Sequence, residues 1–239
     1  MEKVVLKDQD IREPLFDYLE ARYGKVRILE ELVMGKSRAD ILMVTETDII
    51  GIEIKSDADT YARLERQVKD YDLFFDRNIV VVGSTHGLHI REHVPAHWGV
   101  ITVENAGSAL DFYELRETDV NPKVKLERKL SLFWRPELYA LQQMFGMPKY
   151  KEKSKTFVIG KIVEWADKGN IHPKELQEEM CRLLFERDYT TIGEEIREYK
   201  KGEITKKLEA ETDPEQQIKL MMERAVKKAN FHSSLKRKF

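Results

Sequence analysis

The sequence predicts an α/β core with a mixed central sheet flanked by helices, followed by an all-helical C-terminal region. In the first half of the chain, apolar runs typical of strands alternate with segments that have helical spacing. The run at 78–83 is β-branched through its centre, which favours a buried, parallel strand. Beyond residue 123 the strand signal disappears. We therefore expect a sheet domain at 1–118, a helical region at 123–190 and a basic helical tail at 191–239.

The elements of the sheet domain follow from their start and stop signals. In order, we expect a helix at 11–22, strands at 26–33, 41–44 and 49–54, a long helix, and strands at 78–83 and 99–103. Asp8 or Asp10 caps the first helix, and Gly24 ends it. Pro14 lies in the first turn, where proline is tolerated.

The remaining helices are delimited in the same way. Asp57 or Asp59 caps the long helix, whose apolar stripe predicts packing against the sheet. A linker at 117–123 precedes the helical region. Its three helices run from Pro136 to about Phe145, from the cap Ser154 to Lys168, and from Pro173 to Arg187.

The apolar segments at 41–44 and 49–54 are expected to be the arms of a β-hairpin. If the four residues between them form the turn, paired positions sum to 93 and Asp40 lies opposite Glu53. Such side chains have Cβ atoms about 5 Å apart, so two carboxylates there repel each other unless a cation lies between them. Lys55 projects from the same face as Glu53. Two acids and a lysine on one sheet face can bind Mg²⁺ and position a water for phosphodiester hydrolysis.

A competing interpretation is a half-exposed strand whose wet face carries an ordinary Glu and Lys. A chain that is 35% charged often contains an Asp followed at some distance by Glu-x-Lys. The strongly apolar content of both arms favours the functional interpretation, because charges persist inside an apolar strand when they are paired or bound to metal.

The order helix, strand, Asp-led strand, Glu-x-Lys strand, helix and strand resembles the PD-(D/E)XK nuclease superfamily. Its half-motifs here are Ala39-Asp40, with Ala39 in place of the usual proline, and Glu53-Ile54-Lys55. Gln67 and Tyr71 resemble the Gln-x-x-x-Tyr signature of several branches. The chain is most similar to a bacterial and phage family of uncharacterised proteins related to the MmcB-like and Holliday-junction-resolvase-like nucleases.

The resemblance covers roughly residues 9–104 and implies a restriction-endonuclease-like fold. It implies that Asp40 and Glu53 are metal ligands and that the Ile54 carbonyl completes the shell. It also implies that Lys55 orients the attacking water or stabilises the charge that develops on phosphorus. Mg²⁺ or Mn²⁺ is the expected cofactor.

Further site residues are implied by the same resemblance. Gln67 and Tyr71 would hold Lys55 or the nucleic-acid backbone, although Tyr71 is also a natural packing residue. An additional acidic ligand is expected from an earlier element, with Glu31 as the first candidate and Glu13 and Glu20 as weaker ones; each is also a plausible surface acid.

The charge of the chain is divided unevenly. Residues 1–120 carry 15 Lys and Arg against 24 Asp and Glu, a net charge of −9, and the rest of the chain carries 26 against 19, a net charge of +7. Nucleic-acid affinity is therefore expected from the second half, because phosphate binding draws on clustered positive charge.

The segment at 133–185 resembles the helix-extended-helix DNA-binding modules of the SAP type. Its inter-helix loop would present four lysines to phosphate, Lys149, Lys151, Lys153 and Lys155. In the sheet domain, Arg38 is a candidate phosphate contact. The alternative for Arg38 and for the four lysines is that they are ordinary surface cations in contact with water. The basic tail is expected either to lie on nucleic acid or to pair with another chain.

Together these features predict a Mg²⁺-dependent deoxyribonuclease acting in DNA repair, recombination or phage DNA processing. Two alternatives stay open, a non-catalytic nucleic-acid-binding protein on a nuclease fold and an RNA-directed defence nuclease, since no feature discriminates RNA from DNA. A homodimer is expected only from the likeness to resolvases.

Composition indicates a cytoplasmic protein without a membrane partner. No apolar stretch approaches the ~20 residues needed to cross a bilayer, and the first ten residues lack a signal-peptide core. Cys181 is the single cysteine, which excludes an intramolecular disulfide, and its helical surroundings predict a buried small hydrophobe rather than a nucleophile.

Overall fold

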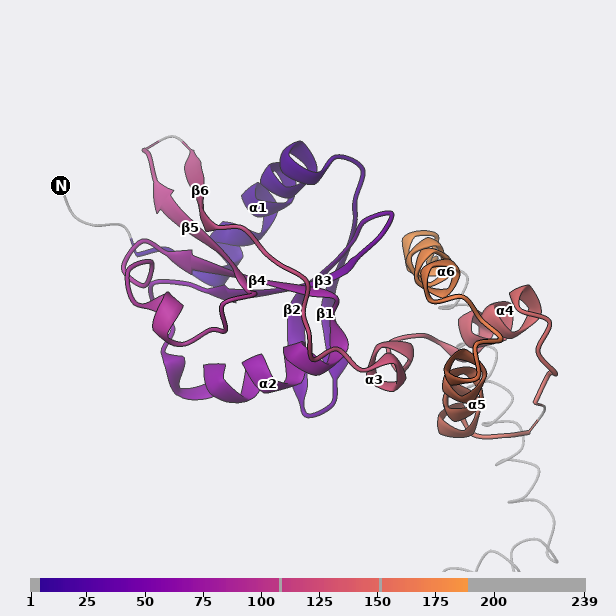
Figure 1. The fold of residues 1–239 in the computed structure, drawn as a ribbon. Helices are drawn as coiled ribbons and strands as arrows, with labels where there is room; N and C mark the ends of the chain where they lie inside the picture. The colour runs from indigo at the N-terminus through magenta and orange to yellow at the C-terminus, as the bar shows by residue number, and fades with distance from the viewer. Residues whose placement is uncertain (1–4, 108, 151, 189–239) are drawn as a thin grey trace, which may run out of the picture. The chain divides into compact units, whose positions relative to one another are not determined.

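A six-stranded mixed sheet forms the centre of the computed structural model, which describes residues 5–107, 109–150 and 152–188 (Figure 1). Its strands are β1 (Arg27–Met34), β2 (Ser37–Val44), β3 (Ile49–Lys55), β4 (Arg77–Gly83), β5 (Gly99–Asn105) and β6 (Leu110–Arg116). The strand order in the sheet equals the order along the chain. β3, β4 and β5 are mutually parallel, and the other neighbours are antiparallel, so the predicted buried parallel strand at 78–83 is confirmed.

Helices cover both faces of this sheet. They are α1 (Asp8–Tyr23) on one face and α2 (Leu64–Phe74) on the other, as Figure 1 shows. The α1 face buries Ile11, Leu15 and Leu19 against Ile52 and other isoleucines and valines of the strands. The α2 face buries the aromatic side of that helix together with the apolar residues of the C-terminal helices. The mixed α/β architecture with helices following the sheet is therefore as expected.

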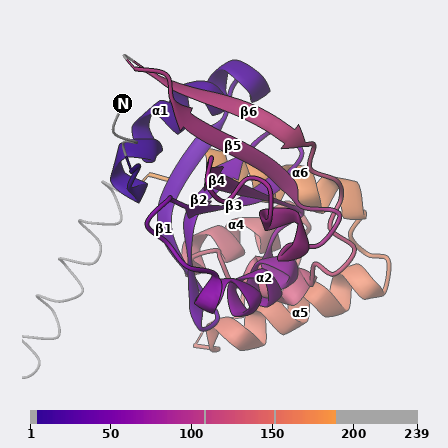
Figure 2. The same ribbon diagram turned by 90° about the vertical axis from the view of Figure 1, so that its left-hand side faces the viewer.

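The edge strand β6 was not expected. It packs beside α1, where the rings of Tyr18 and Phe112 stack with centroids 5.1 Å apart (Figure 2). Every second residue of β6 is exposed, and acidic and basic residues interrupt its apolar ones. This pattern gives a weak strand signal in sequence, because an edge strand buries only one face.

The predicted caps of α1 and α2 are wrong. α1 begins at Asp8 with Lys7 as its N-cap, and the Asp10 carboxylate accepts from the Lys7 backbone N–H at 2.9 Å, as the third residue of a capping box does. Pro14 consequently lies inside the helix rather than in its first turn. Gly24 ends the helix as expected, with a φ of 76°.

Before α2, the chain forms the 3₁₀ turn η1 (Tyr61–Arg63) instead of a capped helix. Asp59 accepts from the backbone N–H and the hydroxyl of Ser56, and Asp57 accepts from Thr85, so neither carboxylate reaches the helix. These aspartates shape the loops at the ends of β3 and β4. A second 3₁₀ turn, η2 (Ile90–Glu92), lies between β4 and β5.

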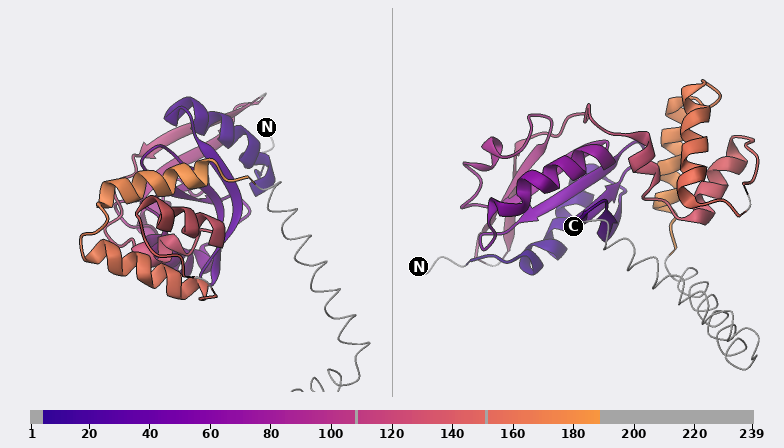
Figure 3. Two further views of the ribbon diagram at one scale, coloured as in Figure 1. Left: turned by 90° about the vertical axis from the view of Figure 1, so that its right-hand side faces the viewer. Right: turned by 90° about the horizontal axis from the view of Figure 1, so that it is seen from below.

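The C-terminal helices of the described residues are α3 (Leu126–Leu130), α4 (Arg135–Met144), α5 (Lys155–Asp167) and α6 (Pro173–Phe185). Figure 3 shows α4, α5 and α6 gathered together, and the contacts of α4 with α5 and α6 agree. The three predicted helices are confirmed, and Ser154 caps α5 by accepting from the Phe157 N–H at 3.1 Å. The short α3 was not predicted.

Polar contacts join the helices to the sheet. The buried Asn121, in the predicted linker, donates to the carbonyls of Asp72 and Phe75 at 2.8 and 2.7 Å. Asp76 accepts from Lys129 at 2.5 Å and from Gln177 at 2.8 Å. The residues up to Glu186 form one unit, the boundary between 118 and 123 stays a prediction, and the predicted tail at 191–239 lies outside the described residues.

Candidate active site

The β2–β3 hairpin carries the candidate site at the end opposite its turn. The four pairs from Val44–Ile49 to Ile41–Ile52 follow the predicted register. At the next position, the Asp40 carboxylate accepts from the Ile54 backbone N–H, with Oδ2 2.8 Å away. The side chain of Asp40 thus reaches across to the Glu53-Ile54-Lys55 strand.

Glu53 is a buried carboxylate, 1% exposed, with three donors around it. The Lys55 ammonium lies 2.6 Å from Oε1, and the Gln67 amide donates to the same oxygen. The Tyr71 hydroxyl lies 2.8 Å from Oε2. The structure therefore brings Lys55, Gln67 and Tyr71 together on Glu53, with two of these donors supplied by one face of α2.

Tyr71 links both arms of the hairpin. Its hydroxyl accepts from the Asp40 backbone N–H at 3.2 Å and lies 3.1 Å from the Ile52 carbonyl as well as close to Glu53. Burial, with the charge of Glu53, raises the pKa of Tyr71 well above its ordinary value. The phenol is a neutral donor that fixes the position of Glu53.

α2 lies close enough to β3 for these contacts because Gly51 has no side chain. A Cβ at Gly51 would lie 2.1 Å from the Phe75 ring. A larger residue there would push Phe75 away, and with it the helix end that carries Tyr71.

The two acids of the site interact. Burial, followed by the negative charge of Glu53, raises the pKa of Asp40 from 3.8 to about 7, although the Ile54 N–H and Lys55 act in the opposite direction. A carboxyl group that titrates near neutral pH is typical of functional sites. Any cation placed between Asp40 and Glu53 would favour the ionised form of Asp40.

A polar cleft of about 300 Å³ opens onto these groups. Its lining consists of Asp8, Arg38, Asp40, Glu53, Ile54, Lys55, Asp59, Arg63 and Gln67. The candidate ligands and Lys55 therefore face a shared space that a substrate can enter. Arg38 lies on the rim, with a side chain that is 63% exposed.

Arg12 of α1 is a site residue that the sequence analysis missed. Its guanidinium lies 2.7 Å from Asp8, 2.8 Å from Glu31 and 3.7 Å from the Asp40 carboxylate, and it donates to the Asp40 carbonyl at 3.2 Å. The spacing of Asp8 and Arg12, four residues apart on a helix, was the available signal. It predicts a pair but not the contact with the sheet.

Glu31, the predicted additional ligand, lies opposite Asp40 in the β1–β2 register, between the pairs Glu30–Ile41 and Leu32–Ala39. Its φ of 56° departs from strand geometry, and its carboxylate is bound to Arg12 and Arg38, each within 2.8 Å. Glu31 does not line the cleft. The weaker candidates Glu13 and Glu20 are exposed on α1.

Of the predicted lysines of the helical region, Lys149 and Lys153 lie between α4 and α5, and Lys155 is the first residue of α5. Lys149 and Lys153 are exposed, whereas the Lys155 ammonium donates to the Ser131 carbonyl at 2.6 Å and so points back to the protein. Lys151 lies outside the described residues.

A divalent metal fits the donors of the cleft by their chemistry. Among the described residues, no group of three or more His, Cys, Asp or Glu is placed to hold a metal. Mg²⁺, however, usually takes only one or two carboxylates and keeps several waters. Asp40, Glu53 and the Ile54 carbonyl supply hard oxygen donors. Burial and then the charge of Glu53 raise the pKa of Asp40, so its ionised form would gain from a cation beside it.

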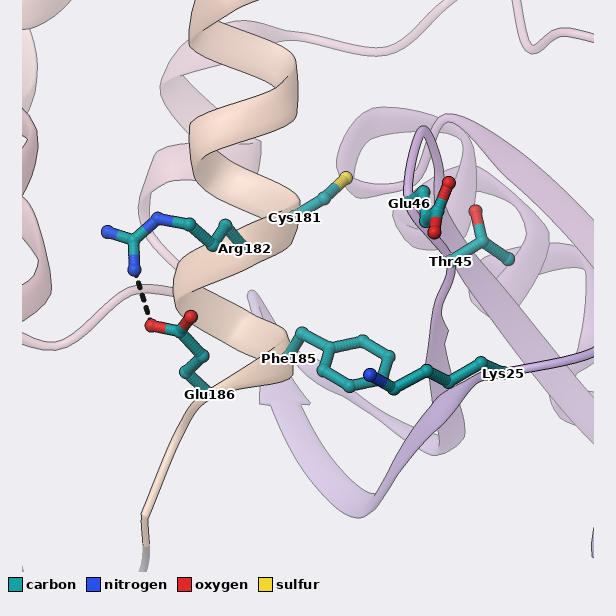
Figure 4. Close-up of a pocket in the computed structure, with 7 residues that line it drawn as sticks. All are labelled: Lys25, Thr45, Glu46, Cys181, Arg182, Phe185 and Glu186. Atoms are coloured by element: carbon teal, nitrogen blue, oxygen red, sulfur yellow. Dashed lines mark hydrogen bonds and ion pairs between the residues drawn. The ribbon is translucent and has the colours of Figure 1, made fainter.

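A second cavity, of about 200 Å³, lies between the β2–β3 turn and α6 (Figure 4). Cys181 lines it and is 1% exposed, and burial raises the pKa of its thiol to about 12. Its burial is as expected, and a thiol with that pKa is not activated as a nucleophile. The Lys25 ammonium lies 5.1 Å from the centroid of the Phe185 ring on the opposite wall.

Within the described part of the chain, no helix combines the length and apolar character required to span a bilayer. No solved structure matches the chain. "Protein cII" of Enterobacteria phage P4 is 23% identical over 146 residues, which cover 60% of this chain and 55% of that protein. The chain thus spans about half the length of the curated relative it matches. The model of the family described as bacteriophage P4 protein cII matches residues 1–207, and the chain belongs to this family.

Proposed function

We propose that the protein is a metal-dependent nuclease that hydrolyses DNA phosphodiester bonds, on a restriction-endonuclease-like fold of the PD-(D/E)XK type. The observation that supports this most is the meeting of Asp40, Glu53 and Lys55 in one cleft. A buried acid, Glu53, beside a half-buried acid with a pKa near 7, Asp40, and an ammonium 2.6 Å from Glu53 are costly to maintain without a ligand.

Each residue has a defined role in this proposal. Asp40, Glu53 and the Ile54 carbonyl would hold Mg²⁺ or Mn²⁺, which when bound would activate water and offset the charge of the phosphate. Lys55 stabilises the negative charge that develops on the phosphorus oxygens. Gln67 and Tyr71 fix the carboxylate of Glu53 through their hydrogen bonds.

The element order supports the fold assignment. α1, β1, the Asp-led β2, the Glu-x-Lys strand β3, α2 and β4 follow in the order of that superfamily. The phage family of the chain favours phage DNA processing over repair or recombination as the setting.

A non-catalytic nucleic-acid-binding protein is the second candidate, and one observation favours it. Both carboxylate oxygens of Glu53 already have donors, and Lys55 is one of them. If this ion pair is permanent, no metal reaches Glu53. Calorimetric titration with Mg²⁺ or Mn²⁺ separates the two, because the enzyme requires saturable binding that Asp40→Ala removes.

The test is a cleavage panel of branched, single-stranded and linear DNA, with RNA beside it, with and without Mg²⁺. We expect Mg²⁺-dependent cleavage that Asp40→Ala and Glu53→Ala abolish while the circular dichroism spectrum is unchanged. Glu65→Ala is the matched control, because Glu65 lies on α2 with a side chain that is 84% exposed. Full activity of either site variant would refute the assignment, and cleavage of RNA alone would replace DNA as the substrate.

A further inference from the structure

The segment between α4 and α5 gathers rings and lysines into what we call the aromatic–lysine surface, defined by Tyr139, Lys149, Tyr150, Lys153 and Phe157. The Lys149 ammonium lies 3.8 Å from the centroid of the Tyr139 ring, and the Lys153 ammonium lies 5.7 Å from that of Phe157. Phe157, in the first turn of α5, is 39% exposed. Isolated exposed apolar residues are common, but a ring with cations beside it is a recognised contact for nucleic acids.

Arg135 and Gln142 hold the backbone of this loop from the inside. The Arg135 guanidinium donates to the carbonyls of Tyr150 and Lys153 at 3.3 and 3.1 Å. The Gln142 amide donates to the Pro148 carbonyl at 2.8 Å. With these carbonyls bound by the helices, binding a ligand requires little ordering of the loop.

The surroundings of Phe157 combine a supported ring with positive charge. Tyr150 meets it edge-on, with centroids 5.4 Å apart and an angle of 78° between the planes. Lys161 is also near the ring but is paired with Glu164 at 2.7 Å. Among the residues that the structure describes, Lys153 has no carboxylate partner, so its charge is available to a phosphate.

Charge complementarity selects a polyanion as the partner. The segment 149–161 contains five lysines against one glutamate, whereas the half of the chain that carries the cleft has a net charge of −9. Nucleic acid held here would supply the affinity that the acidic half lacks.

We propose that the aromatic–lysine surface binds single-stranded DNA, with an unpaired base stacked on Phe157 and backbone phosphates on Lys149 and Lys153. Bases in a duplex are already stacked on each other and present no free face to a protruding ring, so the ring contact selects single strands. The choice of DNA rests on the proposed function, while the presence of an unpaired base follows from the surface itself.

The test is fluorescence anisotropy of the full chain with a labelled single-stranded oligonucleotide in EDTA, where metal-dependent cleavage cannot occur. We expect Phe157→Ala and Phe157→Leu to weaken binding on the order of tenfold, because one base stack is lost, and Phe157→Tyr to retain it. Lys153→Ala should make the negative slope of log affinity against log salt less steep by about 0.7, because one phosphate contact is lost.

The controls are Tyr113→Ala and Lys174→Ala, which remove an exposed ring from β6 and an exposed lysine from α6 and should leave affinity unchanged. Equal binding of duplex, of heparin or of single-stranded RNA would overturn the proposal, as would full affinity of Phe157→Leu. Absence of cleavage with intact single-strand binding would mean that the proposed function fails and this inference holds. Cleavage without this binding would mean the reverse.

Discussion

Two buried carboxylate sites contact α2, and they balance their charge in different ways. Asp72, 3% exposed, accepts from Trp98 Nε1 at 2.8 Å, contacts His97 Nε2 at 3.0 Å and is paired with Lys123 at 2.9 Å. Glu53 is equally buried and has three donors, but it shares its surroundings with Asp40. The Asp72 site has one acid among its donors. The cleft has two acids, with the Lys55 ammonium bound to Glu53 and the Arg12 guanidinium 3.7 Å from Asp40.

The difference teaches that burial of a charge alone does not mark a functional site. A buried acid that is surrounded by donors stabilises the fold, as Asp72 does by joining α2 to the segment around His97 and Trp98. At the cleft, burial and then the charge of Glu53 raise the pKa of Asp40, so the ionised form of Asp40 is disfavoured there. A cation in the cleft would stabilise that ionised form.

The largest expected effect distinguishes the two lysines of these sites. Lys55→Met should reduce Mg²⁺-dependent DNA cleavage by about 10²–10³-fold, because the charge developing on the phosphate loses its nearest ammonium. Lys123→Met should leave the cleavage rate unchanged, since Lys123 serves the Asp72 site. The comparison breaks if both variants cleave at the same rate in a single-turnover assay.

For the free energy of unfolding, the Asp72 site should matter more than the cleft. Asp72→Ala should lower the free energy of unfolding by about 3 kcal/mol, because the buried donors of Trp98 and His97 lose their acceptor. Asp40→Ala should cost far less, since it also removes a repulsion. Urea unfolding at pH 7.5 measures both, and a larger loss for Asp40→Ala would reverse the assignment of structural and functional acids.

The pH dependence of stability should report the raised pKa of Asp40 directly. The folded-state pKa of Asp40 is raised, so the metal-free fold binds a proton more tightly than the unfolded chain does. Protonation of Asp40 therefore contributes to the free energy of unfolding. This contribution is complete below pH ~4 and is lost as pH rises through about 7. It amounts to at most about 4 kcal/mol for a pKa shift from 3.8 to about 7.

Asp40→Asn cannot titrate, so it should lack this decline. Unfolding midpoints of both proteins in EDTA between pH 4 and 8 give the difference curve, and parallel curves would count against the raised pKa. Adding Mg²⁺ at pH 8 should restore stability to the wild type and not to Asp40→Asn.

The smallest expected effect on stability concerns Asp76, a third carboxylate, which is surrounded by hydrogen-bond donors. Gln177→Ala should lower the free energy of unfolding by about 1 kcal/mol, because its hydrogen bonds to Asp76 and the Thr47 carbonyl are lost. Cleavage at saturating DNA should not change. A marked loss of activity would show that the contact between α6 and the hairpin turn matters to the cleft.

Much of the sheet and the centre of the cleft could be predicted from sequence. The hairpin follows from two apolar arms around a short polar turn, and its register places Asp40 and Glu53 side by side before any contact is known. Gln67 and Tyr71 were named from the resemblance to a family signature, and helical spacing adds that they share one face of a helix. These features are local, so the pattern of neighbouring residues contains them.

The missed features depend on packing between distant segments. Arg12 reaches Asp40 only because α1 packs on the face of the sheet that includes β2, and no pattern near Arg12 specifies that. Glu31 was expected as an additional ligand, but its left-handed backbone and its two arginine partners hold its carboxylate outside the cleft. The edge strand β6 escapes because a one-sided strand interrupted by charges lacks the apolar run of a buried one.

Because the strand order in the sheet repeats the chain order, every strand pairs with the strand that precedes or follows it in the sequence. The antiparallel pairs β1–β2, β2–β3 and β5–β6 are joined by short turns, and local pairings of this kind form quickly, whereas the parallel pairs of β4 need longer connections. The cleft-forming acids, their lysine and the tyrosine that joins them all precede residue 75. The groups of the candidate site therefore all come from the first 75 residues of this sequence, ahead of the helices that follow the sheet.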